Sequence, residues 1–267
     1  MKMNLKNKRL YLLDMDGTIY IDETLFDGTL EFLDSVKKNG GRYIFLTNNS
    51  SKGTETYIEK MNRLGISASP EDFLTSTDAT VHYLIKNNLK DKTFYVCGTE
   101  SLRNHFKSLG FKLSENTDDV DVLLLGYDTE LSYKKLEDCC RLLFRKDKEV
   151  IYIATHPDYV CPTEYGCAPD CGSVIEMLKT ATGKTPYVVG KPKPDMALLA
   201  LEKFGYKKEE ACIIGDRLYT DIACGVNAGI DSIFVLSGEG TKDDIDKYNI
   251  HPTYIVDGIK DVLKNMK

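Results

Sequence analysis

The sequence predicts an α/β protein in which a core with a mainly parallel sheet is interrupted by a second, smaller α/β domain. Short apolar runs alternate with amphipathic stretches along the chain, a pattern typical of strand–helix–strand units. The chain has 267 residues, 42% of them hydrophobic, so it is long enough to bury one large core or two modest ones. The middle of the chain repeats the alternation by itself, which favours two domains.

The core strands are predicted from apolar runs bounded by turn residues or charges. These runs are Arg9–Leu13, Arg42–Leu46, Tyr187–Val189, Ala211–Ile214, Ser232–Leu236 and Thr253–Val256. Helical spacing of apolar residues predicts helices at Thr29–Lys38, Thr54–Leu64 and Asp195–Phe204. Residues 1–78 and 184–267 therefore form the two parts of the predicted core domain.

The inserted α/β domain is predicted at residues 79–183. Its strands are expected near Phe94–Cys97, Val122–Leu125 and Val150–Ala154, and its helices near Ser101–Leu109 and Tyr133–Arg145. A segment of this size with strands and helices of its own is a domain rather than a loop.

Charge and hydropathy exclude several classes of partner. The net charge of -6 and the pI near 5.4 argue against a general nucleic-acid or anionic-membrane surface, which needs concentrated positive potential. No stretch approaches the roughly 20 apolar residues of a membrane span, and the apolar run Leu10–Leu13 is too short for a signal peptide. We expect a cytoplasmic protein with a small-molecule partner, no nucleic acid and no membrane.

The eight cysteines are scattered, and we expect them to be reduced. One group, His156, Cys161, Cys167 and Cys171, raises the alternative of a zinc site. Its spacing fits no C-x2-C pair, and prolines and glycines crowd the segment. A proline-rich loop is the interpretation that the pattern favours.

Two carboxylates, Asp14 and Asp16, follow the first predicted strand and precede a glycine turn. The carboxyl ends of parallel strands are where open α/β sheets bind their ligands. The D-x-D-G pattern also occurs in polar loops and in calcium loops, but a calcium loop needs a glutamate at its twelfth position, where this chain has Leu25.

Three further strand ends carry polar side chains. Thr47 and Asn48 end the second strand, Lys191 follows the inserted domain, and Asp216 and Asp221 follow the strand Ala211–Ile214. Each alone is compatible with an ordinary turn, a surface lysine or a polar loop. Four strand ends supplying these groups in chain order are improbable as coincidence.

Together the motifs DMDGT, LTNNS, GKPKP and GDRLYTD resemble the four motifs of haloacid dehalogenase superfamily phosphatases. The large insertion between the second and third motifs resembles the subgroup that includes p-nitrophenyl phosphatase, pyridoxal phosphatase, phosphoglycolate phosphatase and a sugar-operon nucleotide phosphatase. The resemblance implies a Rossmann-like parallel-sheet core with an inserted α/β cap domain, and a homodimer through the cap.

The cap carries a similar pattern with two departures. The stretch Thr155-His156-Pro157-Asp158 is similar to the subgroup's T-N-P-D, but His156 stands where asparagine is usual. Asp170-Cys171 replaces the small residues that are common before Gly172. These departures bear on the substrate rather than on the fold.

The core motifs predict phosphoryl transfer through a covalent intermediate. Asp14 is the candidate nucleophile, since a carboxylate is ionised at neutral pH and forms a labile acyl-phosphate. Asp16 is the candidate general acid/base, so it must hold a proton when substrate binds. Asp14, Asp216 and a phosphate dianion repel one another without a hard divalent cation, and their oxygen atoms point to magnesium.

The resemblance implies the remaining roles. Asp14 and Asp216 coordinate the magnesium through side chains, and Asp16 coordinates it through its carbonyl. The other predicted residues act on the phosphoryl group: Lys191 offsets its charge, Thr47 and Asn48 hold its oxygens, and Asp221 orients Lys191 or the metal shell.

The cap is expected to act as a lid that excludes water and sets specificity. The candidate specificity loop is residues 155–172, with Tyr159, Thr163, Glu164 and Tyr165 as substrate contacts; lid surface or dimer contact are equal alternatives for them. Ser237–Thr241 lacks the third glycine of a dinucleotide fingerprint and is interpreted as a loop.

The predicted function is thus hydrolysis of a small phosphate monoester, with a sugar phosphate, a nucleoside monophosphate and p-nitrophenyl phosphate as candidate substrates. A phosphomutase-type phosphotransferase and a non-catalytic phosphate-binding protein are the alternatives. A signalling receiver domain also phosphorylates an aspartate, but Asp16 and the large insertion disfavour it.

Overall fold

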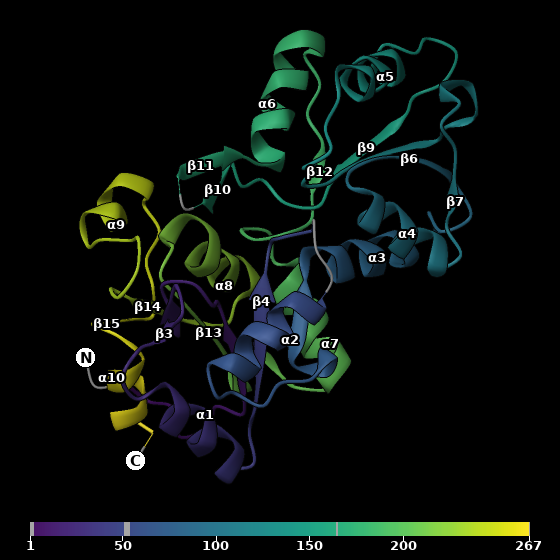
Figure 1. The fold of residues 1–267 in the computed structure, drawn as a ribbon. Helices are drawn as coiled ribbons and strands as arrows, with labels where there is room; N and C mark the ends of the chain where they lie inside the picture. The colour runs from purple at the N-terminus through teal and green to yellow at the C-terminus, as the bar shows by residue number, and fades with distance from the viewer. Residues whose placement is uncertain (1–2, 51–53, 164, 267) are drawn as a thin grey trace. The chain divides into compact units, whose positions relative to one another are not determined.

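The computed structural model describes residues 3–50, 54–163 and 165–266 (Figure 1). The chain divides into two compact units, each built around its own parallel sheet. Unit 1 comprises residues 1–47, 54–75 and 191–267, and unit 2 comprises residues 48–53 and 76–190. The predicted α/β fold class, a parallel-sheet core with an inserted α/β domain, is confirmed.

Unit 1 contains a six-stranded sheet in the order β15-β14-β13-β1-β4-β5, in which every neighbouring pair is parallel. Its strands are β1 Leu10–Leu13, β4 Arg42–Thr47, β5 Phe73–Thr75, β13 Ala211–Gly215, β14 Asp231–Val235 and β15 Tyr254–Val256. A short antiparallel hairpin, β2 Tyr20–Ile21 and β3 Thr24–Leu25, follows β1. The central strand β1 is buried along its whole length, as its apolar run predicts.

The helices of unit 1 are α1 Thr29–Lys38, α2 Thr54–Arg63, α7 Asp195–Phe204, α8 Ala223–Ala228, α9 Asp243–Tyr248 and α10 Ile259–Lys264, with 3-10 turns η1 Pro70–Asp72 and η3 Lys208–Glu210. The α-helices other than α9 each bury at least one residue. In α1, Phe32, Leu33 and Val36 recur at helical spacing and are buried. The Phe32 ring meets the ring of Tyr11 from β1 edge-to-face, with 5.5 Å between the centroids.

Unit 2 contains a five-stranded parallel sheet in the order β12-β9-β8-β6-β7. Its strands are β6 Thr93–Cys97, β7 Lys112–Leu113, β8 Val122–Leu125, β9 Ile151–Ala154 and β12 Tyr187–Val188. Its helices are α3 Ser76–Lys86, α4 Glu100–Ser108, α5 Tyr133–Leu143 and α6 Cys171–Thr182, with a 3-10 turn η2 Thr117–Asp119. An antiparallel hairpin, β10 Val160–Thr163 and β11 Gly166–Pro169, precedes α6.

The strand predicted at Tyr187–Val189 lies in a different sheet from the one expected. It forms β12 and pairs with β9 of unit 2, with Tyr187 opposite Ile153. A two-residue strand carries no periodic signal that identifies its sheet, and the ring of Tyr187 also stacks on that of Tyr83 from α3, 4.6 Å away. The predicted domain boundaries, after residues 78 and 183, fall inside α3 and at the C-cap of α6, and stay a prediction.

Among the described residues, no helix is both long enough and apolar enough to cross a membrane.

Candidate active site

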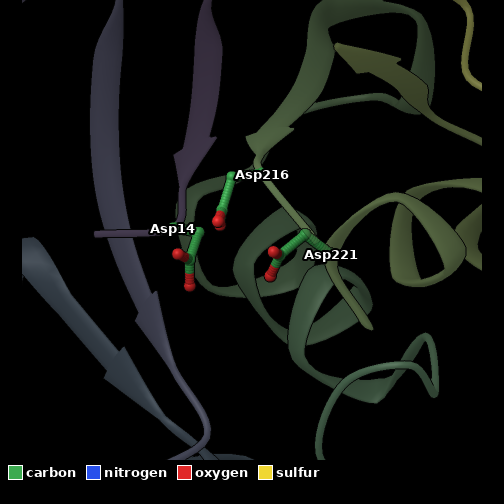
Figure 2. Close-up of side chains that lie close together, drawn as sticks. All are labelled: Asp14, Asp216 and Asp221. Atoms are coloured by element: carbon green, nitrogen blue, oxygen red, sulfur yellow. The ribbon is translucent and has the colours of Figure 1, made fainter. Parts of the chain in front are cut away.

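Three carboxylates, Asp14, Asp216 and Asp221, form an acid cluster at the carboxyl ends of two central strands of unit 1. The register pairs Leu13 with Ile214, so the residues that follow β1 and β13 lie side by side. Asp221 comes from a π-helical turn, η4 Leu218–Ile222, a local geometry that is frequent at functional sites. One oxygen of each carboxylate lies within 4.8 Å of the others, and Figure 2 shows the three side chains converging.

Lys191 joins two members of the acid cluster. Its Nζ lies 2.7 Å from Asp14 Oδ1 and 2.6 Å from Asp221 Oδ1, and it donates to the carbonyl of Leu46 at 3.3 Å. The side chains of Lys191 and Asp221 are almost fully buried, whereas that of Asp14 is 18% exposed. Asp14 is therefore the member of this buried ion-pair network that solvent reaches.

The acid cluster has an excess of negative charge. Burial, and next the Asp221 carboxylate, raise the pKa of Asp14 well above its ordinary value. The same two causes raise the pKa of Asp216 to about 6. Burial disfavours the charge of Lys191, but the carboxylates of Asp14 and Asp221 outweigh it and raise the pKa of Lys191. Within the described residues, the acid cluster is paired with only one ammonium group, that of Lys191, so a further positive charge would stabilise its three carboxylates.

A divalent cation fits this donor set. Asp216 Oδ1 is buried and has no hydrogen-bond partner in the described part of the chain, while Oδ2 accepts the amide of Glu239 at 2.7 Å. A buried carboxylate oxygen without a partner is costly, and carboxylate oxygens are the preferred ligands of hard divalent ions. Asp14 and Asp216 are the residues that would hold it, because both Asp221 oxygens already accept bonds, from Lys191 and from the amide of Arg217 at 3.1 Å.

Asp16 lies in a different environment from Asp14. Its side chain is 68% exposed and contacts the buried Tyr20 and Lys60, whose side chain is 22% exposed. The Tyr20 hydroxyl donates to Asp16 Oδ2 at 3.2 Å, and Lys60 Nζ lies 3.7 Å from Oδ1 and 3.8 Å from the centroid of the Tyr20 ring. The two acids of the D-x-D motif are thus one largely buried and one exposed.

The motif LTNNS, which contains Thr47 and Asn48, is divided between the two units. Thr47 ends β4 in unit 1, and its hydroxyl lies 3.4 Å from the hydroxyl of Tyr57. Asn48 belongs to unit 2, where its amide donates to both carboxylate oxygens of Asp158, at 3.1 and 3.2 Å. The roles of Thr47 and Asn48 as phosphate ligands stay predictions.

The two departures from the family pattern contact each other inside unit 2. The ring of His156 is fully buried, with Nδ1 2.8 Å from the Thr155 hydroxyl and Nε2 2.9 Å from Asp170 Oδ1. Asp170 also caps α6 by accepting the amide of Cys171. We call Thr155, His156 and Asp170 the cap network. It holds the start of α6 to the end of β9.

The four residues considered for zinc do not come together as a metal-binding group within the described residues. Both ring nitrogens of His156 are occupied, and Cys171 Sγ donates to the carbonyl of Leu125. The predicted loop forms the β10–β11 hairpin, on which Tyr165 is 80% exposed, with the exposed Tyr159 just before it. Glu164 lies outside the described residues.

The close approach of Gly17 and Gly238 to Asp216 was not predicted from the sequence. A Cβ on Gly17, which has φ +78°, would lie 2.3 Å from Asp216 Oδ2, and one on Gly238 would lie 2.0 Å from the same atom. Both positions therefore require glycine for the close approach of backbone to carboxylate. The signal for Gly238 was present in Ser237–Thr241, which had been interpreted only as a loop.

Comparisons with known proteins identify the family of this chain. A family model described as haloacid dehalogenase-like hydrolase matches residues 11–112, and a second, HAD-hydrolase-like, matches residues 188–262. An acid sugar phosphatase of Staphylococcus aureus is 32% identical over 98% of this chain and all of its own.

Solved structures give the same result. A 4-nitrophenylphosphatase from Thermotoga maritima superposes with a TM-score of 0.89 at 37% identity, covering 98% of this chain and 99% of its own. A glycerol phosphate phosphatase from Mycobacterium tuberculosis, in complex with calcium, has a TM-score of 0.85 at 28% identity and covers 96% of this chain and 74% of its own.

Fold and site together define a hydrolase whose chemistry is directed at phosphate. The chain belongs to the haloacid dehalogenase-like hydrolases, as its motifs predict, and is a phosphatase of the type that includes p-nitrophenyl phosphatase. The predicted enzyme class, a hydrolase of phosphate monoesters, is confirmed.

Proposed function

We propose that this protein is a magnesium-dependent phosphatase that hydrolyses a sugar phosphate through an aspartyl-phosphate on Asp14. The observation that carries the proposal is the pairing of Asp14 with the buried Lys191, 2.7 Å away, beside the unpartnered Oδ1 of Asp216. This arrangement combines a carboxylate nucleophile, a fixed positive charge and a place for a cation, which are the requirements of phosphoryl transfer.

In the first step an oxygen of Asp14 attacks the phosphorus of the ester. The bond between phosphorus and the leaving oxygen breaks, and that oxygen takes a proton from Asp16. Lys191, oriented by Asp221, offsets the negative charge on the phosphoryl oxygens, and Thr47 holds them.

In the second step water attacks the phosphorus of the aspartyl-phosphate. Asp16 accepts the proton of that water, the acyl-phosphate bond breaks, and inorganic phosphate leaves with Asp14 restored. Asp14 and Asp216 would hold magnesium, which when bound would neutralise charge on the phosphate and on the acids. The exposure of Asp16 suits a group that exchanges protons with substrate and water in turn.

The substrate class is proposed from the full-length similarity to an acid sugar phosphatase. The 4-nitrophenylphosphatase relative supports p-nitrophenyl phosphate as an assay substrate. Nucleoside monophosphates remain the other predicted class, and values of kcat/KM over a panel of sugar phosphates, nucleoside monophosphates and glycerol phosphate separate the two.

The direct test uses p-nitrophenyl phosphate with the purified protein. We expect phosphate release with magnesium, none after chelation, and at least a 10⁴-fold lower kcat in Asp14→Asn, since the nucleophile is lost. Acid quenching after incubation with a radiolabelled phosphate ester should leave label on the wild-type protein but not on Asp14→Asn.

The matched control is Asp261→Asn, which removes the carboxylate of an exposed ion pair with Lys264 in α10. It should retain wild-type kcat. Activity of Asp14→Asn close to that of this control would overturn the proposed nucleophile, and transfer of the phosphoryl group to a sugar rather than to water would support the phosphomutase alternative.

A further inference from the structure

The segment that follows β14, residues 237–240, contacts the Asp216 carboxylate of the acid cluster. Gly238 lies against Asp216 so closely that no side chain fits, and the amide of Glu239 donates to Asp216 Oδ2 at 2.7 Å. The hydroxyl of Ser237 donates to the carbonyl of Gly17 at 2.7 Å, which ties the same segment to the turn after β1. The position of Asp216 Oδ1 therefore depends on where this segment lies.

The side chain of Glu239 is fixed by two residues that follow Asp216 in the chain. Arg217 Nε lies 2.8 Å from Glu239 Oε2, and the Tyr219 hydroxyl donates to Oε1 at 3.0 Å. We call Arg217, Tyr219 and Glu239 the Glu239 clamp. The backbone bond from Glu239 to Asp216 and the side-chain bonds from Glu239 to Arg217 and Tyr219 connect the Glu239 segment to the residues that follow β13, so the segment has two separate restraints.

The Glu239 clamp also pairs the positive charge of Arg217, which lies beside the acid cluster. The Arg217 guanidinium interacts electrostatically with Asp14, Asp216 and Asp221. An unpaired cation at this place repels a second cation, whereas the ion pair with Glu239 offsets that charge and fixes the direction of the guanidinium. Glu239 is thus placed to favour cation binding without contacting the cation.

We propose that the Glu239 clamp is a positioning device that sets the divalent-cation affinity of the acid cluster. This inference rests on the proposed function, since it assumes that Asp14 and Asp216 hold the metal. Residues that orient metal ligands typically change metal affinity by 10- to 100-fold when they are removed. Glu239 acts through the position of Asp216 and through the charge of Arg217.

The experiment measures magnesium binding by titration calorimetry on the metal-free full chain, without substrate. We expect Glu239→Gln to raise the Kd for magnesium about tenfold or more. Tyr219→Phe keeps the ion pair and removes one hydrogen bond, so its Kd should rise less, about threefold. Asp261→Asn, the exposed-pair control, should bind like the wild type.

A double variant separates charge from position. Glu239→Gln with Arg217→Gln removes the unpaired guanidinium, so magnesium should bind more tightly to it than to Glu239→Gln alone. A double variant that binds no better than Glu239→Gln overturns the role of charge. Unchanged Kd values in both Glu239→Gln and Tyr219→Phe overturn the inference as a whole. A wild-type protein that binds no magnesium refutes the metal site of the proposed function instead.

Discussion

Two buried polar groups, one in each unit, differ in how completely their atoms are paired. In the acid cluster of unit 1, Asp216 Oδ1 has no partner in the described part of the chain, and burial raises the pKa of Asp14 and Asp216. In the cap network of unit 2, both ring nitrogens of His156 are hydrogen-bonded, and Asp170 also caps a helix.

The difference separates a group with a buried carboxylate oxygen that is unpaired within the described residues from a group in which the ring nitrogens and the helix cap are paired. Buried polar atoms are nearly always satisfied, and an unpaired carboxylate oxygen among other carboxylates is an arrangement that a cation could stabilise. A fully satisfied network stabilises the fold and needs nothing further. This comparison predicts opposite behaviour: changes in the acid cluster should alter activity and metal dependence, whereas changes in the cap network should alter stability.

The largest effect is expected for Lys191→Met, which leaves Asp14 and Asp221 without their shared partner. The free energy of unfolding should fall by about 3 to 5 kcal/mol, because removing one member of a buried ion pair strands the other. The kcat for p-nitrophenyl phosphate should fall at least 10³-fold, since the charge facing the phosphoryl group is lost. Urea unfolding and steady-state kinetics measure the two effects.

Lys8→Met is the matched control. Lys8 is also buried, pairs with Asp231 at 2.8 Å and donates to the carbonyls of Glu209 and Ala211, but it lies at the opposite end of β13. It should lose comparable stability and keep kcat at a temperature where both variants are folded. Equal losses of kcat in the two lysine variants would show that Lys191 matters only for folding.

The second prediction concerns the pH dependence of stability in the metal-free protein. Because the pKa of Asp216 is raised to about 6, the folded state keeps a proton that the unfolded chain loses near pH 4. Stability should therefore fall as pH rises from about 4 to about 6 and stay reduced above, by about 3 kcal/mol at about 1.4 kcal/mol per pKa unit. Urea unfolding with a chelator at pH 4.5 and 7.5 measures this.

Asp216→Asn serves as the comparison for that measurement. An amide carries no charge at any of these pH values, so the variant should lose the part of the pH dependence that Asp216 contributes and gain stability at pH 7.5 in the absence of metal. The part contributed by Asp14, whose pKa is also raised, should remain. Magnesium should stabilise the wild-type protein at pH 7.5 and not the variant. An unchanged pH profile in Asp216→Asn contradicts the assignment.

The third prediction concerns the cap network. His156→Ala leaves the carboxylate of Asp170 and the hydroxyl of Thr155 without the ring, so the free energy of unfolding should fall by about 2 kcal/mol. The kcat for p-nitrophenyl phosphate should stay within about twofold. His251→Ala, which changes an exposed ring bonded to Asn249, should cost much less in the same urea titration. A large loss of kcat with unchanged stability would place the network in catalysis.

The sequence predicted the elements whose patterns are local. The strand predicted at Ala211–Ile214 is β13 Ala211–Gly215, and the one at Arg9–Leu13 is β1 Leu10–Leu13, because a buried parallel strand is a continuous apolar run with a clear end. The same logic predicted Asp14 and Asp216 at the ends of two strands, and the structure shows that these strands are neighbours.

Contacts between distant loops were beyond such reasoning. The folded chain brings Glu239 into contact with Arg217 and His156 into contact with Asp170. A single charged residue in a loop has no periodicity from which its partner can be predicted. The exposure of Asp16 is another case, since its distance from Asp14 in the chain says nothing about the direction of its side chain. The glycines at positions 17 and 238 were the sequence signal for the close approach of the backbone to Asp216.

The smallest effect is expected for the ion pair of Asp16, because the Asp16 carboxylate faces solvent. Lys60→Met removes the ammonium near Asp16 Oδ1, but water solvates a carboxylate that is 68% exposed, so the free energy of unfolding should change by less than about 1 kcal/mol. Urea titration of Lys60→Met beside Lys191→Met makes the comparison with chemically identical substitutions. A loss above about 3 kcal/mol for Lys60→Met would show that pairing, rather than burial, decides which polar clusters this fold depends on.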